Sequence, residues 1–287
     1  MTTIKNPIEY TGAQIANMGH ALGSLGRSVH HIQDTIHSPA PAVREIGVSD
    51  LKDALARGFE DFEAYRTDVV FLCAVYAVVG LILARLAFGM EMLPLIFPLA
   101  SGFALIGPLA AVGLYEMSRT RERGEIATWG NVLELGRAPA AGGILMLGLL
   151  LVAIFLFWQW TAWMIFRFTL GPEQPASVMS FLHDVFLTHA GWAMIAIGVG
   201  VGFLFALVAM SISLVSFPLL IDRDVGLDTA IATSIRAVRL NPIPTAAWGL
   251  IVAVGLVAGS IPLFVGLVVT VPVLGHATWH LYRKIVV

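Results

Sequence analysis

Charged residues and cysteine are scarce in this sequence. Only 13% of its 287 residues are Asp, Glu, Lys or Arg, and 57% are hydrophobic, whereas a soluble domain usually carries about 25% charged residues. This composition excludes an ordinary soluble enzyme. The single cysteine, Cys73, excludes an intramolecular disulfide and a multi-cysteine metal site. With a net charge of −2, the chain also lacks the basic field that attracts nucleic acid, so no nucleic-acid partner is expected.

Motifs of nucleotide binding and catalysis are missing as well. The sequence has no P-loop, no dinucleotide-binding fingerprint, no serine elbow and no paired catalytic carboxylates in a soluble domain. Near the start, Lys5, Pro7 and Glu9 stand where a signal peptide would need an apolar core. We therefore expect a protein that is not an enzyme and carries no cofactor.

Long apolar runs are present instead, and they can cross a hydrocarbon layer of about 30 Å. The last run, 246–281, is too long for one helix at about 1.5 Å per residue, so we divide it near Pro262. The prediction is an all-α polytopic membrane helix bundle, in which residues 68–287 form six transmembrane helices. The predicted spans are 69–88, 93–115, 144–166, 193–221, 246–261 and 263–281.

The region before the first span divides in two. Residues 1–48 are rich in Gly, Ser, His and Pro and are predicted to be a flexible tail. Residues 49–67 are predicted to form a cytoplasmic amphipathic helix capped by Ser49. Its apolar stripe consists of Leu51, Leu55, Phe59 and Phe62, and its polar face of Lys52, Asp53, Glu60, Asp61 and Glu63.

Basic residues indicate the orientation, because Lys and Arg concentrate in short cytoplasmic loops. Four basic clusters fall on one side only if the last run crosses twice, and a five-span model would place Arg283 and Lys284 outside. We therefore expect a multi-pass protein of the bacterial inner membrane with both termini cytoplasmic. Pro108–Arg119 can be aligned with Pro272–Arg283, and Phe217-Pro218 is similarly placed. This favours three related hairpins, with convergent composition at the membrane edge as the alternative.

Two histidines are the first candidate site. His276 and His280 are spaced i, i+4, which places both imidazoles on one helix face where they can hold a metal or flank a haem. The alternative is an interfacial role beside Trp279 and Tyr282.

A polar cluster is the second candidate site. Glu116, Asp222 and His276 fall at the cytoplasmic ends of spans two, four and six, where they would make a proton or cation site. Alternatively, the carboxylates pair with neighbouring arginines.

Small residues suggest close helix packing, either within the chain or between copies of it. Two glycines spaced four residues apart occur twice, as Gly198 with Gly202 and as Gly255 with Gly259. At the outer end of span three, Trp158, Trp160 and Trp163 are predicted to form an aromatic belt at the membrane interface.

Three stretches carry a resemblance to a known family: Gly107–Glu116, Ser216–Val225 and Val271–Arg283. The sequence resembles a family of uncharacterised prokaryotic integral membrane proteins, a domain of unknown function some of whose members are described as cytochrome c oxidase subunits. The resemblance implies no catalytic haem-copper role, because such a subunit needs six histidine ligands on several helices. It leaves open an accessory or assembly role beside a respiratory complex.

These features lead to three functional hypotheses. The first is a non-catalytic integral inner-membrane protein that associates with the lipid bilayer and with other membrane proteins, such as a respiratory (cytochrome oxidase) complex, or with itself. The second is a small transporter or channel with its site near the cytoplasmic ends of spans two, four and six, favoured by prolines that break helices. The third is a haem or metal protein that uses His276 and His280.

Overall fold

The computed structural model describes residues 38–65, 85, 93–127, 134–136, 138–171, 173, 175–262 and 265–287. In this part the chain is helical, apart from turns, connecting segments and one isolated antiparallel bridge between Val43 and Val286. The predicted all-α class is therefore confirmed for the described residues.

Four segments are long and apolar enough to cross a membrane, by length and composition. The predicted span 69–88 lies outside the described residues except for Arg85. The predicted span 263–281 corresponds to α12 (Leu267–Ile285), which is not one of the four segments. The first segment, Leu93–Glu122, contains η1 (Leu93–Leu95), α3 (Ile96–Ala110) and α4 (Val112–Glu122). The second is α6 (Ala141–Thr169), and the third, His189–Asp222, contains α8 (His189–Ser213) and α9 (Ser216–Asp222). The fourth is α11 (Pro242–Ser260).

Prolines lie beside the two breaks inside these segments. Pro108 lies in the last turn of α3, and the helix is interrupted at Ala111 before α4 begins. Pro218 lies in the first turn of α9, just after the interruption at residues 214–215. A proline has no backbone N–H and its ring crowds the preceding turn, so a helix bends or breaks near it. The helical path is therefore interrupted at both places.

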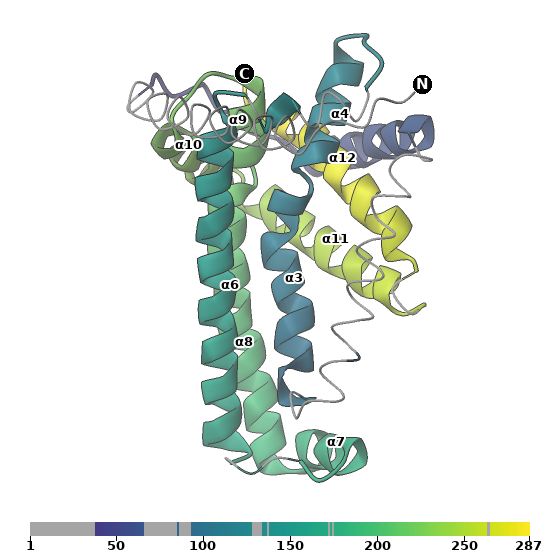
Figure 1. Ribbon diagram of the computed structural model, residues 1–287, viewed down its shortest axis with the longest axis vertical. Helices are drawn as coiled ribbons and strands as arrows, with labels where there is room; N and C mark the ends of the chain where they lie inside the picture. Colours follow the sequence, from purple (N-terminus) through teal and green to yellow (C-terminus); the bar gives the residue numbers. More distant parts are fainter. Residues whose placement is uncertain are drawn as a thin grey trace, which may run out of the picture.

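The helices form two regions (Figure 1). Helices α3, α6 and α8 run side by side along the long axis of the molecule, and α7 (Val178–Leu187) lies across one end of them. At the other end is a group of short helices that we call the cap. The cap consists of residues 38–65, α4, α9, α10 (Leu227–Leu240) and residues 275–287 at the end of α12.

Helices α11 and α12 pack against each other as a hairpin that starts and ends at the cap. At its tip the two backbones almost touch, because a Cβ atom on Gly266 would lie 2.8 Å from the Cα atom of Gly259. Any side chain at either position would force the helix ends apart. In Figure 1 the tip lies between the levels of the two ends of α6.

Burial differs between the two regions. In the cap, Leu51, Phe217, Trp279 and Ile285 are at most 2% exposed. In the long helices, large apolar side chains such as Leu149, Phe157 and Phe203 are more than half exposed. A water-soluble protein does not expose apolar surface on that scale, so the long helices have the surface expected in lipid.

Residues 38–47, which the sequence analysis assigns to the flexible tail, lie along α10 and the end of α12. The N–H of Arg44 donates to the carbonyl of Ile285 and that of Val287 to the carbonyl of Ala42, both at 3.0 Å. The buried amide of Asn241 accepts from the N–H of Ile46 at 2.7 Å and donates to the carbonyl of Arg44 at 3.1 Å. The segment is thus joined to the C-terminal residues by backbone hydrogen bonds.

Candidate functional site: two polar networks in the cap

The first network begins on the helical residues 48–65. Leu51, Ala54, Gly58 and Phe62 recur at spacings of three and four and face the rest of the cap. Close contact is possible because Gly58 has no side chain, and a Cβ atom there would lie 2.6 Å from Cβ of Ala277 on α12. This packing carries the next residue on that face, Asp61, into the interior of the cap.

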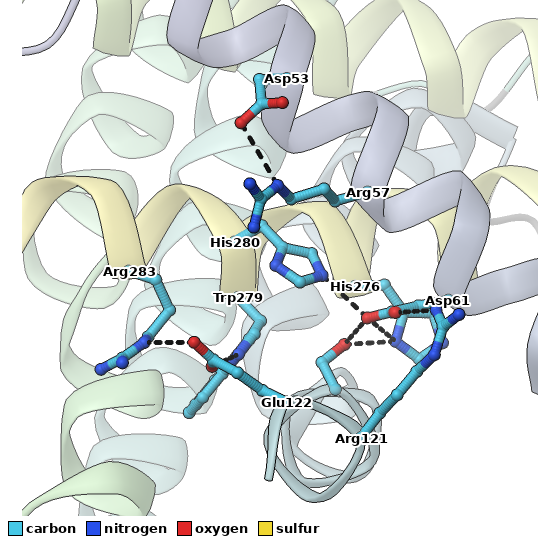
Figure 2. A network of polar contacts seen from close by, with 10 residues as sticks. Asp53, Arg57, Asp61, Arg121, Glu122, His276, Trp279, His280 and Arg283 are labelled. Atoms are coloured by element: carbon cyan, nitrogen blue, oxygen red, sulfur yellow. Dashed lines mark hydrogen bonds and ion pairs between the residues drawn. The ribbon is translucent and has the colours of Figure 1, made fainter. Parts of the chain in front are cut away.

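Asp61 is 4% exposed and is the centre of the network. Its Oδ2 atom accepts hydrogen bonds from Ser118 Oγ at 2.6 Å and from His280 Nε2 at 2.9 Å. Its Oδ1 atom accepts from the guanidinium of Arg121. Ser118 Oγ also lies 2.8 Å from His276 Nδ1. Figure 2 shows Asp61, Arg121, His276 and His280 converging from the 48–65 helix, α4 and α12.

The hydrogen bonds determine where the protons lie. Ser118 has one hydroxyl hydrogen, and it is donated to Asp61. Ser118 Oγ must therefore accept from His276, which places a proton on His276 Nδ1. Asp61 is then the acceptor at the end of a chain that runs from His276 through Ser118. No described group meets His276 Nε2 with hydrogen-bonding geometry, although His276 is completely buried.

Asp61 remains ionised because its partners outweigh its burial. Burial raises the pKa of a carboxyl group, since it disfavours the charge. Hydrogen bonds from His280 and Ser118, the positive charge that His280 can carry and a hydrogen bond from Arg121 all act in the opposite direction. The net result is a pKa of Asp61 below its ordinary value.

A second network joins α4, α9 and α12. Asp222 Oδ2 accepts from the hydroxyl of Tyr282 at 2.8 Å and from Arg283 at 3.3 Å. Arg283 also donates to Glu122 at 3.1 Å, and the other oxygen of Glu122 accepts from the indole of Trp279 at 3.1 Å. The pairs hold the ends of three helices together.

The predicted cluster of Glu116, Asp222 and His276 is divided between these networks. Arg119 lies between the two carboxylates, at 3.1 Å from Glu116 Oε2 and 3.8 Å from Asp222 Oδ1. His276 belongs instead to the network of Asp61, 4.0 Å from Asp61 Oδ2. The geometry of Glu116 and Asp222 fits the alternative in which arginine neutralises them.

His276 and His280, the pair predicted to hold a metal, each use one ring nitrogen in a hydrogen bond. His276 Nδ1 is engaged with Ser118, and His280 Nε2 with Asp61. Within the described ranges, no group of three or more His, Cys, Asp or Glu residues is arranged to hold a metal ion. The two imidazoles are arranged for hydrogen bonding.

Ser118, His276 and Asp61 are the residue types of a catalytic triad, but their order differs. In a triad the Asp bonds the imidazole nitrogen that faces away from the Ser. Here Asp61 and His276 both bond the hydroxyl of Ser118, and the three side chains are at most 5% exposed. An imidazole that donates to the serine oxygen does not activate it as a nucleophile.

Sequence reasoning missed Asp61, Ser118 and Glu122. The placement of Asp61 on the polar face of its helix is wrong, because the residue is only 4% exposed. Its position seven residues after Ala54 and three after Gly58 was the available signal, since those two small residues permit close helix contact.

The four glycines expected at helix contacts lie in different surroundings. A Cβ atom on Gly259 would lie 2.5 Å from Thr270 Oγ1, one on Gly255 would lie 3.2 Å from Leu274, and one on Gly202 would lie 3.0 Å from the ring of Trp158. Gly198 has no described atom within 4 Å of such a Cβ atom. Three of the four therefore pack within the chain, and Gly198 faces away from the described neighbours of α8.

Residues 96–222 match the model of a family described as "Predicted integral membrane protein (DUF2189)". The resemblance to an uncharacterised integral membrane family is thus confirmed over this part, which includes the first of the three stretches that suggested it and most of the second. No curated protein and no solved structure is significantly similar to the chain. The protein is an integral membrane protein whose apolar helices sit in the lipid bilayer.

Proposed function

We propose that the chain is a non-catalytic membrane protein that works by associating with other membrane proteins or with copies of itself. The observation that carries this proposal is the pairing of the polar side chains in the cap with one another. Asp61, Ser118 and His276 are buried, and Asp222 and Glu122 share the positive charge of Arg283 and accept hydrogen bonds from Tyr282 and Trp279. Their role is to join segments that are distant in sequence.

The distribution of basic residues supports a location in the bacterial inner membrane with the cap on the cytoplasmic side. Arg167 lies at the opposite end of α6, and the cap holds most of the other described basic residues. Because the α11–α12 hairpin returns to the cap, residues 38–65 and Val287 lie on one side. This favours six spans with both termini cytoplasmic. The basic residues of the cap are Arg44, Lys52, Arg57, Arg119, Arg121, Arg236, Arg239, Arg283 and Lys284, and Arg223 follows directly after α9.

The outward surface of α8 offers a place for association. Gly198 and Gly200 face space free of described atoms within 4 Å of an added Cβ atom, and Ile197 and Val199 beside them are about half exposed. Small residues let a helix from another chain approach closely in a membrane. A respiratory complex such as cytochrome oxidase is the partner that the family resemblance suggests.

The test is purification of the tagged full chain from its own membranes in a mild detergent, followed by quantitative mass spectrometry and mass measurement. We expect either a stoichiometric membrane-protein partner or a defined oligomer. Gly198→Leu should reduce that association, and Val199→Leu, which adds one methylene at an exposed neighbour, should leave it unchanged. A lone monomer from membranes solubilised in several mild detergents would overturn the proposal.

A small transporter or channel is the second candidate function. Besides the two amide atoms of Gln159 on α6, two buried nitrogen atoms have no hydrogen-bond partner among the described residues, His276 Nε2 and Arg119 Nε. Both lie near the broken segment of α3 and α4, and broken helices expose backbone groups that bind ions or substrate. Flux of protons, cations and organic anions into liposomes that contain the purified protein tests this candidate, and Arg119→Gln should abolish any flux. The absence of flux for all three classes would remove it.

A further inference from the structure

Helix α7 carries an apolar surface at the end of the molecule opposite the cap. It lies beside the start of α8 and near η1, at an angle to the long helices instead of continuing along them (Figure 1). Its start is fixed by reciprocal hydrogen bonds between Ser177 and Ser180, which satisfy backbone groups of the first turn. At ten residues, it is too short to cross a bilayer.

The corner between α7 and α8 holds α7 at this angle. Thr188 ends α7 and caps α8, because its hydroxyl donates to the carbonyl of Asp184 at 2.6 Å and accepts from the N–H of Gly191 at 3.0 Å. Gly191 lies so close to the last turn of α7 that no side chain fits there. The direction of α7 is therefore built into the fold.

The helix has three sides at a spacing of about 100° per residue. Phe181 and Val185 face the protein, where Phe181 meets Phe166 of α6 with ring centroids 6.5 Å apart. Leu182, Phe186 and Met179 form the next side and are 41%, 53% and 75% exposed. The remaining side carries His183 and Asp184, whose side chains are more than half exposed, and between them Leu187 in the last turn, which is 73% exposed.

Aromatic residues surround α7 at the same end of the bundle. The indole of Trp192 donates to the carbonyl of Phe186 at 3.0 Å, which links α8 to the last turn of α7. On α6, Trp163 lies against the guanidinium of Arg167, 4.8 Å from the ring centre. Tryptophan and arginine at the end of a membrane helix mark the interface between acyl chains and headgroups.

We propose that α7 lies in the lipid interface on the side of the membrane opposite the cap, with Met179, Leu182 and Phe186 inserted among the acyl chains. Its polar side, with His183 and Asp184, faces water. An interfacial helix of this kind limits how far α6 and α8 can tilt or slide through the bilayer.

Lipid fits this surface better than another protein for two reasons. The exposed apolar side of α7 continues the exposed apolar surface of α6 and α8, which is covered by lipid in any case. The only ionisable residues in α7 are His183 and Asp184, so the helix has no charge pattern for a specific partner. The same neutrality predicts that attachment does not depend on anionic lipids.

The test uses spin labels in the full chain, reconstituted in phosphatidylcholine vesicles on a Cys73→Ser background. Met179→Cys and Phe186→Cys place the label on the apolar side, and Asp184→Cys is the matched control on the polar side. We expect labels at 179 and 186 to collide at least threefold more with oxygen than with a water-soluble nickel chelate, and the label at 184 to show the reverse. Adding phosphatidylglycerol should change neither result.

Three outcomes would contradict the proposal. If labels at 179 and 186 are as accessible to the nickel chelate as the label at 184, α7 lies in water. If they are shielded from both reagents, α7 is covered by protein. If the labels of two molecules also broaden each other's spectra, that protein is a second copy of the chain. A strong requirement for phosphatidylglycerol would also contradict the neutral contact.

Discussion

Ser118 is the residue on which the larger network depends, because it separates two groups with opposite demands. The hydroxyl accepts from His276 and donates to Asp61, so one small side chain satisfies a buried imidazole and a buried carboxylate. Each of these groups would be costly to leave unpaired at this depth. Only a residue that both donates and accepts can occupy the position.

Replacing Ser118 by Ala should therefore destabilise the cap. The change removes one hydrogen-bond partner from His276 Nδ1 and one from Asp61, and it should cost about 1–3 kcal/mol of unfolding free energy. Denaturant unfolding of the purified protein in detergent, followed by tryptophan fluorescence, measures this loss. Ser260→Ala is the control, because Ser260 Oγ only donates to the carbonyl of Leu256 in its own helix. Equal losses for both variants would contradict the role given to Ser118.

The charge of Asp61 should give the cap a defined acid dependence. The pKa of Asp61 is lowered below its ordinary value of 3.8 in the folded protein, so the folded state binds its proton less readily than the unfolded state. This contribution to stability is complete above pH 3.8 and is lost as the pH falls through the lower folded value. His276, His280 and Arg121 face the same carboxylate.

Comparison with Asp61→Asn isolates this effect, because the variant keeps the three cationic or imidazole neighbours. The wild-type protein should be more stable than the variant at pH 6, and the difference should shrink below about pH 4. Thermal melting from pH 6 to pH 3 measures the difference. A constant difference across that range would show that the ionisation of Asp61 does not stabilise the fold.

The candidate site shows what sequence patterns can reveal at this scale. The i, i+4 spacing was enough to place His276 and His280 on one helix face, because it depends only on helix geometry. Their partners were not accessible in the same way. Asp61 and Ser118 are 57 residues apart, and no periodicity within one helix indicates which helices meet.

At the scale of elements, close contact between the 48–65 helix and α12 depends on Gly58. Gly58→Ala places a methyl group 2.6 Å from Ala277 and should separate the two helices. We expect faster hydrogen exchange in residues 48–65 by at least tenfold, which corresponds to about 1.4 kcal/mol of local opening free energy. Hydrogen–deuterium exchange with mass spectrometry measures it.

The matched control is Gly198→Ala, since a Cβ atom there meets no described atom within 4 Å. Alanine also favours a helix by up to about 1 kcal/mol relative to glycine. This variant should therefore be as stable as the parent protein or slightly more stable. Unchanged exchange in Gly58→Ala would mean that the helix is held only by its polar contacts.

The sequence predicted the positions of the helices where a hydrophobic pattern marked them. Apolar length indicated the regions of α3, α6, α8 and α11, because crossing lipid requires long uninterrupted hydrophobic stretches. The cap depends on long-range contacts, such as the hydrogen bonds of Asn241 to residues 44 and 46. Such contacts leave no local pattern.

At the scale of the whole molecule, the two regions have opposite burial and meet different solvents. The long helices expose apolar side chains and the cap buries them, together with a set of paired charges. The boundary falls near the breaks beside Pro108 and Pro218, where the chain leaves the bundle. The prolines thus coincide with the change from lipid-facing to cap structure.

The tip of the α11–α12 hairpin decides the topology of the molecule. Six spans require Ile261, which is 77% exposed, to reach the side opposite the cap. On a Cys73→Ser background, Ile261→Cys and Glu173→Cys should react with a membrane-impermeant maleimide in intact spheroplasts, whereas Lys52→Cys should react only after the membrane is opened. The exposed backbone of a turn is costly in hydrocarbon, so a tip held there would need cover from another protein. Failure of Ile261→Cys to react from either side would contradict six spans and identify a hairpin that stops within the bilayer.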